Sequence, residues 1–446
     1  MTSFFLLVIR FAKAADMLNN SLRIPRAALW MLAVLLEHAD GGVTSFQLLR
    51  APALAPAGSP GTTGSSVSLG LQNLQNNAYY ISVPVGTPAQ TMLLQIDTGS
   101  AWTWIGSSQC QSAGNCNDAN PFVAANSASF KDVSHGNQTT VSYSVGSVAG
   151  ALSTDTFQVG NASVQHFSFV LASIENGIIQ NQQAGAYDGV VGLALQGGVT
   201  SPAGSSPTLF QAMLAQNLLS EPVFSIALNP MDPSQAASTN TPADGGSILF
   251  GGTDPSLYTG DILQYPVVDA FFWSIALSSV SFNLSSRPAL LQAPSGTTIM
   301  FDSGTSYTTL NQAFLDNTVM PILYAAAGVQ APTGQSAGFY RIPCDATLPD
   351  LVFDFGDAIP YKLAGALLVQ PRGDADGACI VALGGSSGSM WILGEDFLGS
   401  HYAVFGASDG GWVGLASQVR RGLAFKGFST RTAVSSATKT RAGLAH

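Results

Sequence analysis

The sequence predicts an all-β protein with two β-rich lobes and a few short helices, and three observations support this. Charged residues make up only 9% of the 446 residues, against 46% hydrophobic residues and 47 glycines. Helices usually carry charged side chains on their solvent-facing side, so their scarcity favours strands. Short β-type runs separated by turn residues recur between residues 75 and 416. An Asp-x-Gly motif also occurs twice in matching surroundings, which indicates two related halves in a chain long enough for two domains.

The individual elements follow from local patterns. Residues 78–83, 247–250 and 401–405 are typical strands, rich in aromatic and β-branched side chains. Two stretches look helical, 207–214 and 311 to about 327, and Pro321 is expected to bend or interrupt the second. Residues 232–246 are polar and show no periodicity, so we expect an exposed loop there.

The N-terminal region resembles a targeting signal. Residues 27–36 form an apolar run behind Arg23 and Arg26. That run is too short for a bilayer, which takes about 20 residues, but it suits the core of a signal peptide. We therefore expect residues 1–40 to be a signal or targeting region, with Met17 as an alternative start, and no stable membrane span. An uncleaved anchor is the alternative interpretation.

The remaining boundaries follow from composition and from the doubled motif. Residues 41–74 are expected to be a short pro-segment or linker, because much of this stretch is rich in Ala, Pro, Gly, Ser and Thr. Residues 75–228 and 229–418 are expected to form the N-terminal and C-terminal lobes. Residues 419–446 carry six of the 16 basic residues and are expected to be a disordered basic tail.

The charge of the chain excludes one class of partner. The formal net charge is −10, and residues 75–416 carry 5 Lys/Arg against 23 Asp/Glu. Nucleic-acid binding needs a basic face, so we expect no nucleic-acid partner. An acidic surface loses its self-repulsion as the pH falls, which suits a protein that works in acid.

Four cysteines and the three Asn-x-Ser/Thr triplets that follow residue 40 depend on export for their meaning. The cysteines form one pair in each half, and an even count in an exported chain suggests disulfides, with four buried thiols as the alternative. No CxxC or histidine cluster is present, so no metal site is expected. If the chain is exported, the triplets that begin at Asn137, Asn161 and Asn283 are glycosylation acceptors.

The doubled motif points to chemistry. Residues 97–100 read Asp-Thr-Gly-Ser and residues 302–305 read Asp-Ser-Gly-Thr. Each copy follows an apolar run and precedes, by about ninety residues, two apolar residues and a glycine at 190–192 and 392–394. A duplicated fold would bring the two aspartates together. Two neighbouring carboxylates cannot both ionise easily, so such a pair shares a proton and can act as acid and base.

With these motifs the chain resembles the pepsin-like aspartic endopeptidases, especially their secreted fungal branch. The resemblance covers residues 75 to 418 and adds further motifs in the same order: Val-Gly-Thr-Pro at 85–88, Trp104, Tyr143 within 141–147, 187–193, Phe-Gly-Gly at 250–252 and Trp391 before 392–394. It implies two β-rich lobes around a cleft, with one aspartate from each lobe. It also implies a protein or peptide substrate cut at acid pH beside apolar residues, inhibition by pepstatin-like compounds, no cofactor and a monomer.

The resemblance also implies residue roles. Asp97 and Asp302 correspond to the catalytic pair that activates a water molecule. The supporting residues of the pair are Thr98, Gly99, Ser100, Ser303, Gly304 and Thr305. Tyr143 corresponds to the tyrosine of the flap, the hairpin that closes over substrate, with Gly146 as its hairpin glycine and Trp104 as the hydrogen-bond partner of that tyrosine. The cysteines would pair as Cys110–Cys116 and Cys344–Cys379.

Two other functions fit parts of the sequence. A catalytically inactive relative would bind proteins or glycans, although such relatives usually lose a residue that this chain keeps. An acidic adhesive β-sandwich or barrel would explain the composition but not the doubled motif. The expected location is secreted, with a vacuolar or an anchored protein as the alternative.

Overall fold

The computed structural model describes residues 64–419 apart from 75, 77, 114–115, 117–119, 179–186, 197, 201–203, 232–242, 285–287, 331–339, 358 and 372–378. The predicted targeting region at 1–40, most of the predicted pro-segment and the tail from 420 onward lie outside the described residues.

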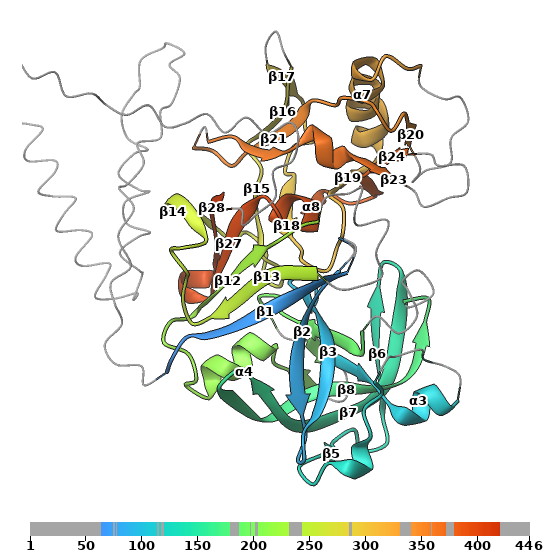
Figure 1. Cartoon of the computed structure of the whole chain (residues 1–446), viewed down its shortest axis with the longest axis vertical. Coiled ribbons are helices and arrows are strands. Elements are labelled where there is room, and N and C mark those ends of the chain that lie inside the picture. The colour runs from blue at the N-terminus through green and yellow to red at the C-terminus, as the bar shows by residue number, and fades with distance from the viewer. Residues whose placement is uncertain are drawn as a thin grey trace, which may run out of the picture. The chain divides into compact units, whose positions relative to one another are not determined.

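The prediction of a β-rich protein with few, short helices is confirmed (Figure 1). The largest sheet has 14 strands, in the order β14-β28-β27-β12-β13-β1-β2-β3-β9-β4-β8-β7-β5, with β6 paired to β7. Its strands from the first half are β1 (Val67–Leu74), β2 (Ala78–Val85), β3 (Gln90–Asp97), β4 (Trp104–Gly106), β5 (Lys131–Asp132), β6 (Gln138–Tyr143), β7 (Gly146–Val159), β8 (Ala162–Asn176), β9 (Gly189–Gly192) and β12 (Val223–Leu228). Its strands from the second half are β13 (Ala243–Phe250), β14 (Tyr258–Pro266), β27 (His401–Gly406) and β28 (Trp412–Gln418).

Smaller sheets complete the second half. A five-stranded sheet contains β15 (Ser274–Ala276), β18 (Thr298–Phe301), β26 (Met390–Leu393), β19 (Thr309–Asn311) and β25 (Gly384–Ser386). A four-stranded sheet contains β17 (Pro288–Leu291), β16 (Ser279–Asn283), β21 (Asp350–Asp354) and β22 (Tyr361–Leu363). A three-stranded sheet contains β20 (Arg341–Ile342), β24 (Cys379–Val381) and β23 (Val369–Pro371). A separate hairpin of β10 (Gly198–Thr200) and β11 (Gly204–Ser206) belongs to the first half.

The helices are short. The α-helices are α3 (Ser108–Ser112), α4 (Leu209–Ala215), α6 (Gln312–Phe314), α7 (Met320–Ala326) and α8 (Glu395–Leu398). The 3₁₀-helices are η1 (Ala124–Asn126), η4 (Gly365–Leu368) and η5 (Ser408–Gly410), and η3 (Leu315–Val319) is a π-helix. No helix within the described ranges is long and apolar enough to cross a membrane.

Both predicted helices form, and local chemistry sets their limits. Thr208 caps α4 in a capping box with Gln211, which satisfies backbone N–H groups at the helix start. The second prediction, from residue 311 to about 327, corresponds to three consecutive pieces, α6, η3 and α7. Pro321 lies in the first turn of α7, where its missing N–H costs least, directly after the π-helical interruption.

Two predicted boundaries are wrong. Residues 67–74, expected to belong to the pro-segment or linker, form β1, which pairs with β13 on one side and β2 on the other. Residues 243–246, expected to end an exposed loop, begin β13. In both cases β1 and β13, which are distant in the sequence, supply each other's backbone hydrogen bonds. The local composition of each segment suggested a loop because it does not show this partner.

The core joins the two halves through Phe224 of β12. Its ring stacks on Phe405 of β27 at 4.7 Å and meets Phe210 of α4 edge to face at 4.9 Å. It also contacts Trp273 of the second half at 5.8 Å. Burying one such aromatic side chain stabilises a fold by about 1.5–3 kcal/mol, so this cluster fixes β12 and β27 side by side.

Candidate active site

Two matching strand pairs carry the two motif aspartates. In the first half β3 runs parallel to β9, with Asp97 opposite Gly192, and the backbone oxygen of Asp97 accepts a hydrogen bond from Leu193 at 2.8 Å. In the second half β18 runs parallel to β26, and the N–H of Asp302 donates to the oxygen of Leu393 at 3.0 Å. Each aspartate therefore stands at the end of a buried strand that a motif from about ninety residues later holds in place.

Glycine follows each aspartate at the second position because the loops approach each other closely. A Cβ built on Gly99 would lie 2.4 Å from Cγ of Asp302, and one built on Gly304 would lie 2.5 Å from Oδ1 of Asp97. Carbon atoms do not approach non-bonded atoms at these distances. Only glycine therefore lets the backbone of each half pass beside the carboxyl group of the other.

Each carboxyl group accepts one backbone and one hydroxyl hydrogen bond. For Asp97 the donors are the N–H of Gly99, at 3.0 Å, and the hydroxyl of Ser100. For Asp302 the donors are the N–H of Gly304, at 2.8 Å, and the hydroxyl of Thr305, at 2.6 Å. The doubled motif thus produces the same cradle twice, and the cradle fixes the orientation of both carboxyl groups.

Below the aspartates, Thr98 and Ser303 connect the two loops. The N–H of Thr98 donates to Oγ of Ser303 at 3.1 Å, and the N–H of Ser303 donates to Oγ1 of Thr98 at 2.9 Å. Each hydroxyl donates in turn to a carbonyl of the opposite half, Phe301 at 2.8 Å and Ile96 at 3.0 Å. Four buried hydrogen bonds therefore fix the two loops relative to each other.

The carboxyl groups are buried and interact directly. Asp97 and Asp302 are 7% and 6% exposed. Burial raises the pKa of Asp97, and the neighbouring charge of Asp302 raises it further. The bonds from Ser100 and Gly99 oppose this rise only in part. The arrangement therefore favours one shared proton between the two aspartates.

A hairpin of β6 and β7 carries Tyr143, whose place in the sequence suggested a flap. Tyr143 pairs with Gly146 across the turn, and its hydroxyl accepts a hydrogen bond from Nε1 of Trp104 at 2.9 Å. Burial raises the pKa of Tyr143, and the charge of Asp97 raises it further. The structure thus pairs Tyr143 with Gly146 at the end of the hairpin and links Tyr143 to Trp104 of β4.

Two acidic residues that belong to none of the predicted motifs lie near this pair. Glu395 and Asp396 begin α8, directly after the glycine of the second apolar-apolar-Gly motif. Burial raises the pKa of Glu395 well above its usual value, followed by the charges of Asp302 and Asp396. Burial also raises the pKa of Asp396 to about 7, against two hydrogen bonds from Thr308. In the sequence, two consecutive acidic residues follow directly on an apolar run and a glycine. Side chains at such a position are expected to be buried rather than solvated.

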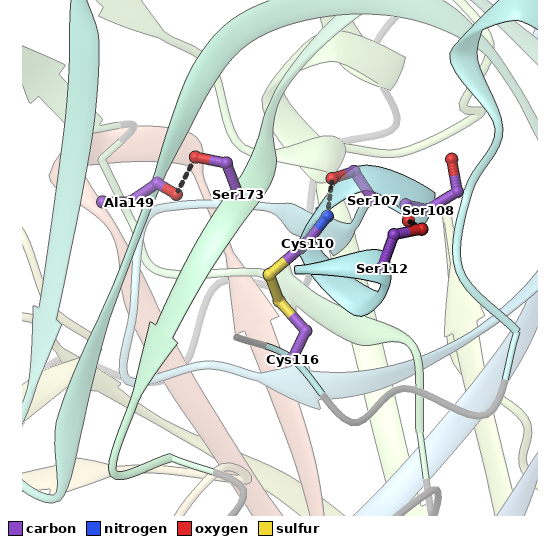
Figure 2. The surroundings of a disulfide bond; sticks show 7 residues. All are labelled: Ser107, Ser108, Cys110, Ser112, Cys116, Ala149 and Ser173. Atoms are coloured by element: carbon purple, nitrogen blue, oxygen red, sulfur yellow. Dashed lines mark hydrogen bonds between the residues drawn. A yellow bond between two sulfur atoms is a disulfide. The ribbon is translucent and has the colours of Figure 1, made fainter. Parts of the chain in front are cut away.

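Both cysteine pairs form disulfides, Cys110–Cys116 and Cys344–Cys379, with Cα atoms 5.3 Å and 5.0 Å apart. Figure 2 shows the first pair beside Ser107, whose hydroxyl accepts the N–H of Cys110 at 3.0 Å at the start of α3. Cys110 and Cys116 lie with Glu175 in the one group of potential metal ligands among the described residues. Because both sulfur atoms are already used in the disulfide, this group does not fit a metal ion.

Comparison with known proteins agrees with this geometry. The family profile of the eukaryotic aspartyl proteases matches residues 78–418. Gastricsin of Mus musculus is 31% identical over 350 residues, which cover 77% of this chain and 81% of the relative. Pepsin A of Sus scrofa is 31% identical over 357 residues, which cover 78% and 83%. Pepsin A of Canis lupus familiaris is 29% identical over 388 residues, which cover 86% and 91%. The chain therefore belongs to the eukaryotic aspartyl protease family and is an aspartic-type endopeptidase with a pepsin-like fold.

Proposed function

We propose that this enzyme hydrolyses internal peptide bonds of proteins at acid pH, with Asp97 and Asp302 as the catalytic pair. The observation that carries this proposal is the close approach of two buried carboxyl groups, each held by one hydroxyl and one backbone N–H. A Cβ built on Gly304 would lie 2.5 Å from Oδ1 of Asp97 and 3.2 Å from Oδ1 of Asp302. The pair titrates as a unit, so the shared proton belongs to both residues rather than to one.

The chemistry follows from one shared proton. The ionised carboxylate removes a proton from a bound water, whose oxygen attacks the carbonyl carbon of the peptide bond. The protonated carboxyl group donates its proton to the carbonyl oxygen, so the tetrahedral intermediate is neutral. When the C–N bond breaks, the proton taken from water passes to the leaving nitrogen, and the hydroxyl of the intermediate returns the other proton. The products are a carboxylic acid and an amine, and the pair regains its single proton.

The substrate of this proposal is an extended peptide that lies between the pair and the Tyr143 hairpin. Such a peptide adds main-chain hydrogen bonds to a strand edge, and pockets for alternate side chains give specificity. Val145, in the turn of the hairpin, is 56% exposed and offers an apolar surface.

Phe271, also 56% exposed, supports a preference for apolar residues around the cut. Its carbonyl accepts the N–H of Gln196, four residues after Gly192, at 3.2 Å. Two residues later, the carbonyl of Trp273 accepts the N–H of Phe301, the residue before Asp302, at 3.1 Å. The loop of Phe271 is therefore tied to both halves close to the catalytic pair.

The proposed location is outside the cell. The two disulfides suit an oxidising compartment, and the predicted targeting region would supply export. A vacuolar or an anchored enzyme is the alternative. Membership in the fungal branch, inhibition by pepstatin-like compounds, a pro-segment and a monomeric state stay predictions from the sequence.

The test is a cleavage assay on the full chain produced through a secretory pathway. We expect cleavage of an unfolded protein at roughly pH 3 to 5, where a proton-sharing pair is half-protonated. Asp97→Asn and Asp302→Asn should each abolish cleavage, while Asp261→Asn, which changes an exposed carboxylate on β14, should not. Pepstatin should inhibit. A folded protein that binds pepstatin without cleaving, even after acid pre-incubation, would favour the inactive binding relative over the enzyme.

A further inference from the structure

One of the three Asn-x-Ser/Thr triplets that follow the predicted targeting region lies where the folded protein can carry a sugar without rearrangement. Attachment of an N-linked glycan replaces one hydrogen of the asparagine amide and needs a hydroxyl two residues later. Because the glycan is bulky and hydrophilic, the folded chain must leave that amide open to solvent.

Asn161 meets these conditions. It is exposed and forms, with Gly160, the two-residue turn between β7 and β8, where Val159 pairs with Ala162 (Figure 1). Gly160 has a φ of 55°, the positive value that the first residue of such a turn requires. No hydrogen bond to the Asn161 side chain is made by any residue within the described ranges, so the amide is free.

The hydroxyl of the triplet is accessible as well. Ser163 is partly exposed, and its Oγ accepts a hydrogen bond from Nε2 of Gln165 at 2.7 Å. Gln165 is itself exposed, so this contact breaks at little cost. The serine hydroxyl is not committed as a donor, which leaves its proton available.

The other two triplets are more constrained. The Asn137 amide donates to the backbone oxygen of Ser134 at 3.1 Å, and Thr139 is only 3% exposed. Asn283 lies inside a sheet, where it pairs with Pro288 on one side and Asp350 on the other. The serine of that triplet, Ser285, lies outside the described residues.

We propose that Asn161 carries an N-linked glycan. This inference rests on the proposed export of the chain, because the sugar donor is a lipid-linked oligosaccharyl pyrophosphate of the secretory pathway. The amide nitrogen of Asn161 forms a bond to C1 of the first sugar, the bond from C1 to the pyrophosphate oxygen breaks, and the amide gives up one proton. No oxidation or reduction is involved.

The glycan would lie far from the flap end of β7. β7 runs from Gly146 at the flap to Val159 beside the turn, 14 residues that span about 45 Å of strand. A Cβ on Gly160 would lie 2.8 Å from Cγ1 of Val67, so the turn packs on the first residue of β1. The sugar therefore lies beside Val67, at the start of β1. Cleavage of short peptides should not depend on it.

The test produces the full chain in a eukaryotic secretory host, once with its own N-terminal region and once with an unrelated signal peptide. Total protein from cells and medium is treated with a peptide N-glycosidase in ¹⁸O-labelled water, and peptides containing residue 161 are analysed by mass spectrometry. We expect Asp labelled with ¹⁸O at position 161. Asn161→Gln and Ser163→Ala should remove one glycan from the intact protein, whereas Ser163→Thr should keep it.

Unlabelled Asn161 in protein made with the unrelated signal would overturn the proposal, as would a glycan count that Asn161→Gln leaves unchanged. Measuring total protein keeps this result independent of folding. If the glycan appears only with the unrelated signal, the site stands and the proposed export by the chain's own N-terminal region fails. Equal kcat/KM of Asn161→Gln and the unchanged enzyme on a short peptide would support the remote position.

Discussion

Thr98 and Ser303 each donate a backbone N–H to the hydroxyl of the other, although 205 positions separate them in the chain. Both side chains are fully buried. Neither residue can form this contact within its own half, so the separation of the two aspartate loops depends on the pair. Because they follow Asp97 and Asp302 directly, this contact fixes the two aspartate loops relative to each other.

Thr98→Val should destabilise the enzyme and lower its activity. The change leaves the N–H of Ser303 and the carbonyl of Phe301 buried without a partner, and each such group costs about 1–3 kcal/mol. Urea unfolding at pH 4 measures the loss, with Thr98→Ser as the matched control that keeps the hydroxyl. Ser303→Ala should couple with Thr98→Val in a double-mutant cycle. Equal stability of the Val and Ser variants would contradict this role.

Gly99→Ala should abolish most activity. The added methyl group would lie 2.4 Å from Cγ of Asp302, so one loop must move, and a displacement of about 1 Å costs roughly 100-fold in rate. The kcat on a peptide substrate is the measurement. Gly70→Ala on β1 is the matched control, because no atom lies within 4 Å of its added Cβ. An active Gly99→Ala enzyme would show that the loops tolerate a wider separation.

Stability should fall as the pH rises toward neutrality. Burial raises the pKa of Asp396 from 3.8 to about 7, and burial with nearby carboxylates raises the pKa of Glu395 and Asp97 as well. A raised folded-state pKa means that the folded protein binds the proton more tightly. This stabilisation is therefore fully present below the unfolded pKa and is lost as the pH rises through the folded pKa. We expect the free energy of unfolding to decrease between about pH 4 and pH 7.

Asp396→Asn tests whether Asp396 contributes to this pH dependence of stability. Removal of one titrating group should reduce the slope of unfolding free energy against pH by up to about 1.4 kcal/mol per pH unit. Denaturant unfolding at several pH values measures the slope, with Asp261→Asn on β14 as the exposed control. If Asp396→Asn and the unchanged enzyme show the same slope, Asp396 is not a source of the pH dependence.

Phe271→Ser should weaken the selection of apolar substrates. Loss of one aromatic contact should lower kcat/KM about tenfold, or about 1.4 kcal/mol, for peptides with large apolar residues beside the cut. Peptides with small residues there should change little. Leu290→Ser serves as the control, because it removes a 64% exposed side chain from β17 in the four-stranded sheet. Similar losses on all peptides would assign Phe271 a purely structural role.

The sequence predicted the fold class and the two matching aspartate loops because both depend on repeated local patterns. The runs before Asp97 and Asp302 form β3 and β18, and the apolar-apolar-Gly motifs form the parallel neighbours β9 and β26. The boundary at residue 74 failed because β1 is stabilised by pairing with β13, which begins almost 170 residues later. Local composition carries no information about such a partner.

By itself, the sequence determined where the two carboxyl-bearing loops lie, since an acid, a small hydroxyl residue and a glycine in one order favour a tight loop. Only the tertiary structure decided what surrounds them. It placed Glu395 and Asp396 near the pair, and it set the exchange of hydrogen bonds between Thr98 and Ser303. It also placed Asn161 at an exposed turn. These features depend on burial and on distances between remote segments, and both are properties of the folded chain.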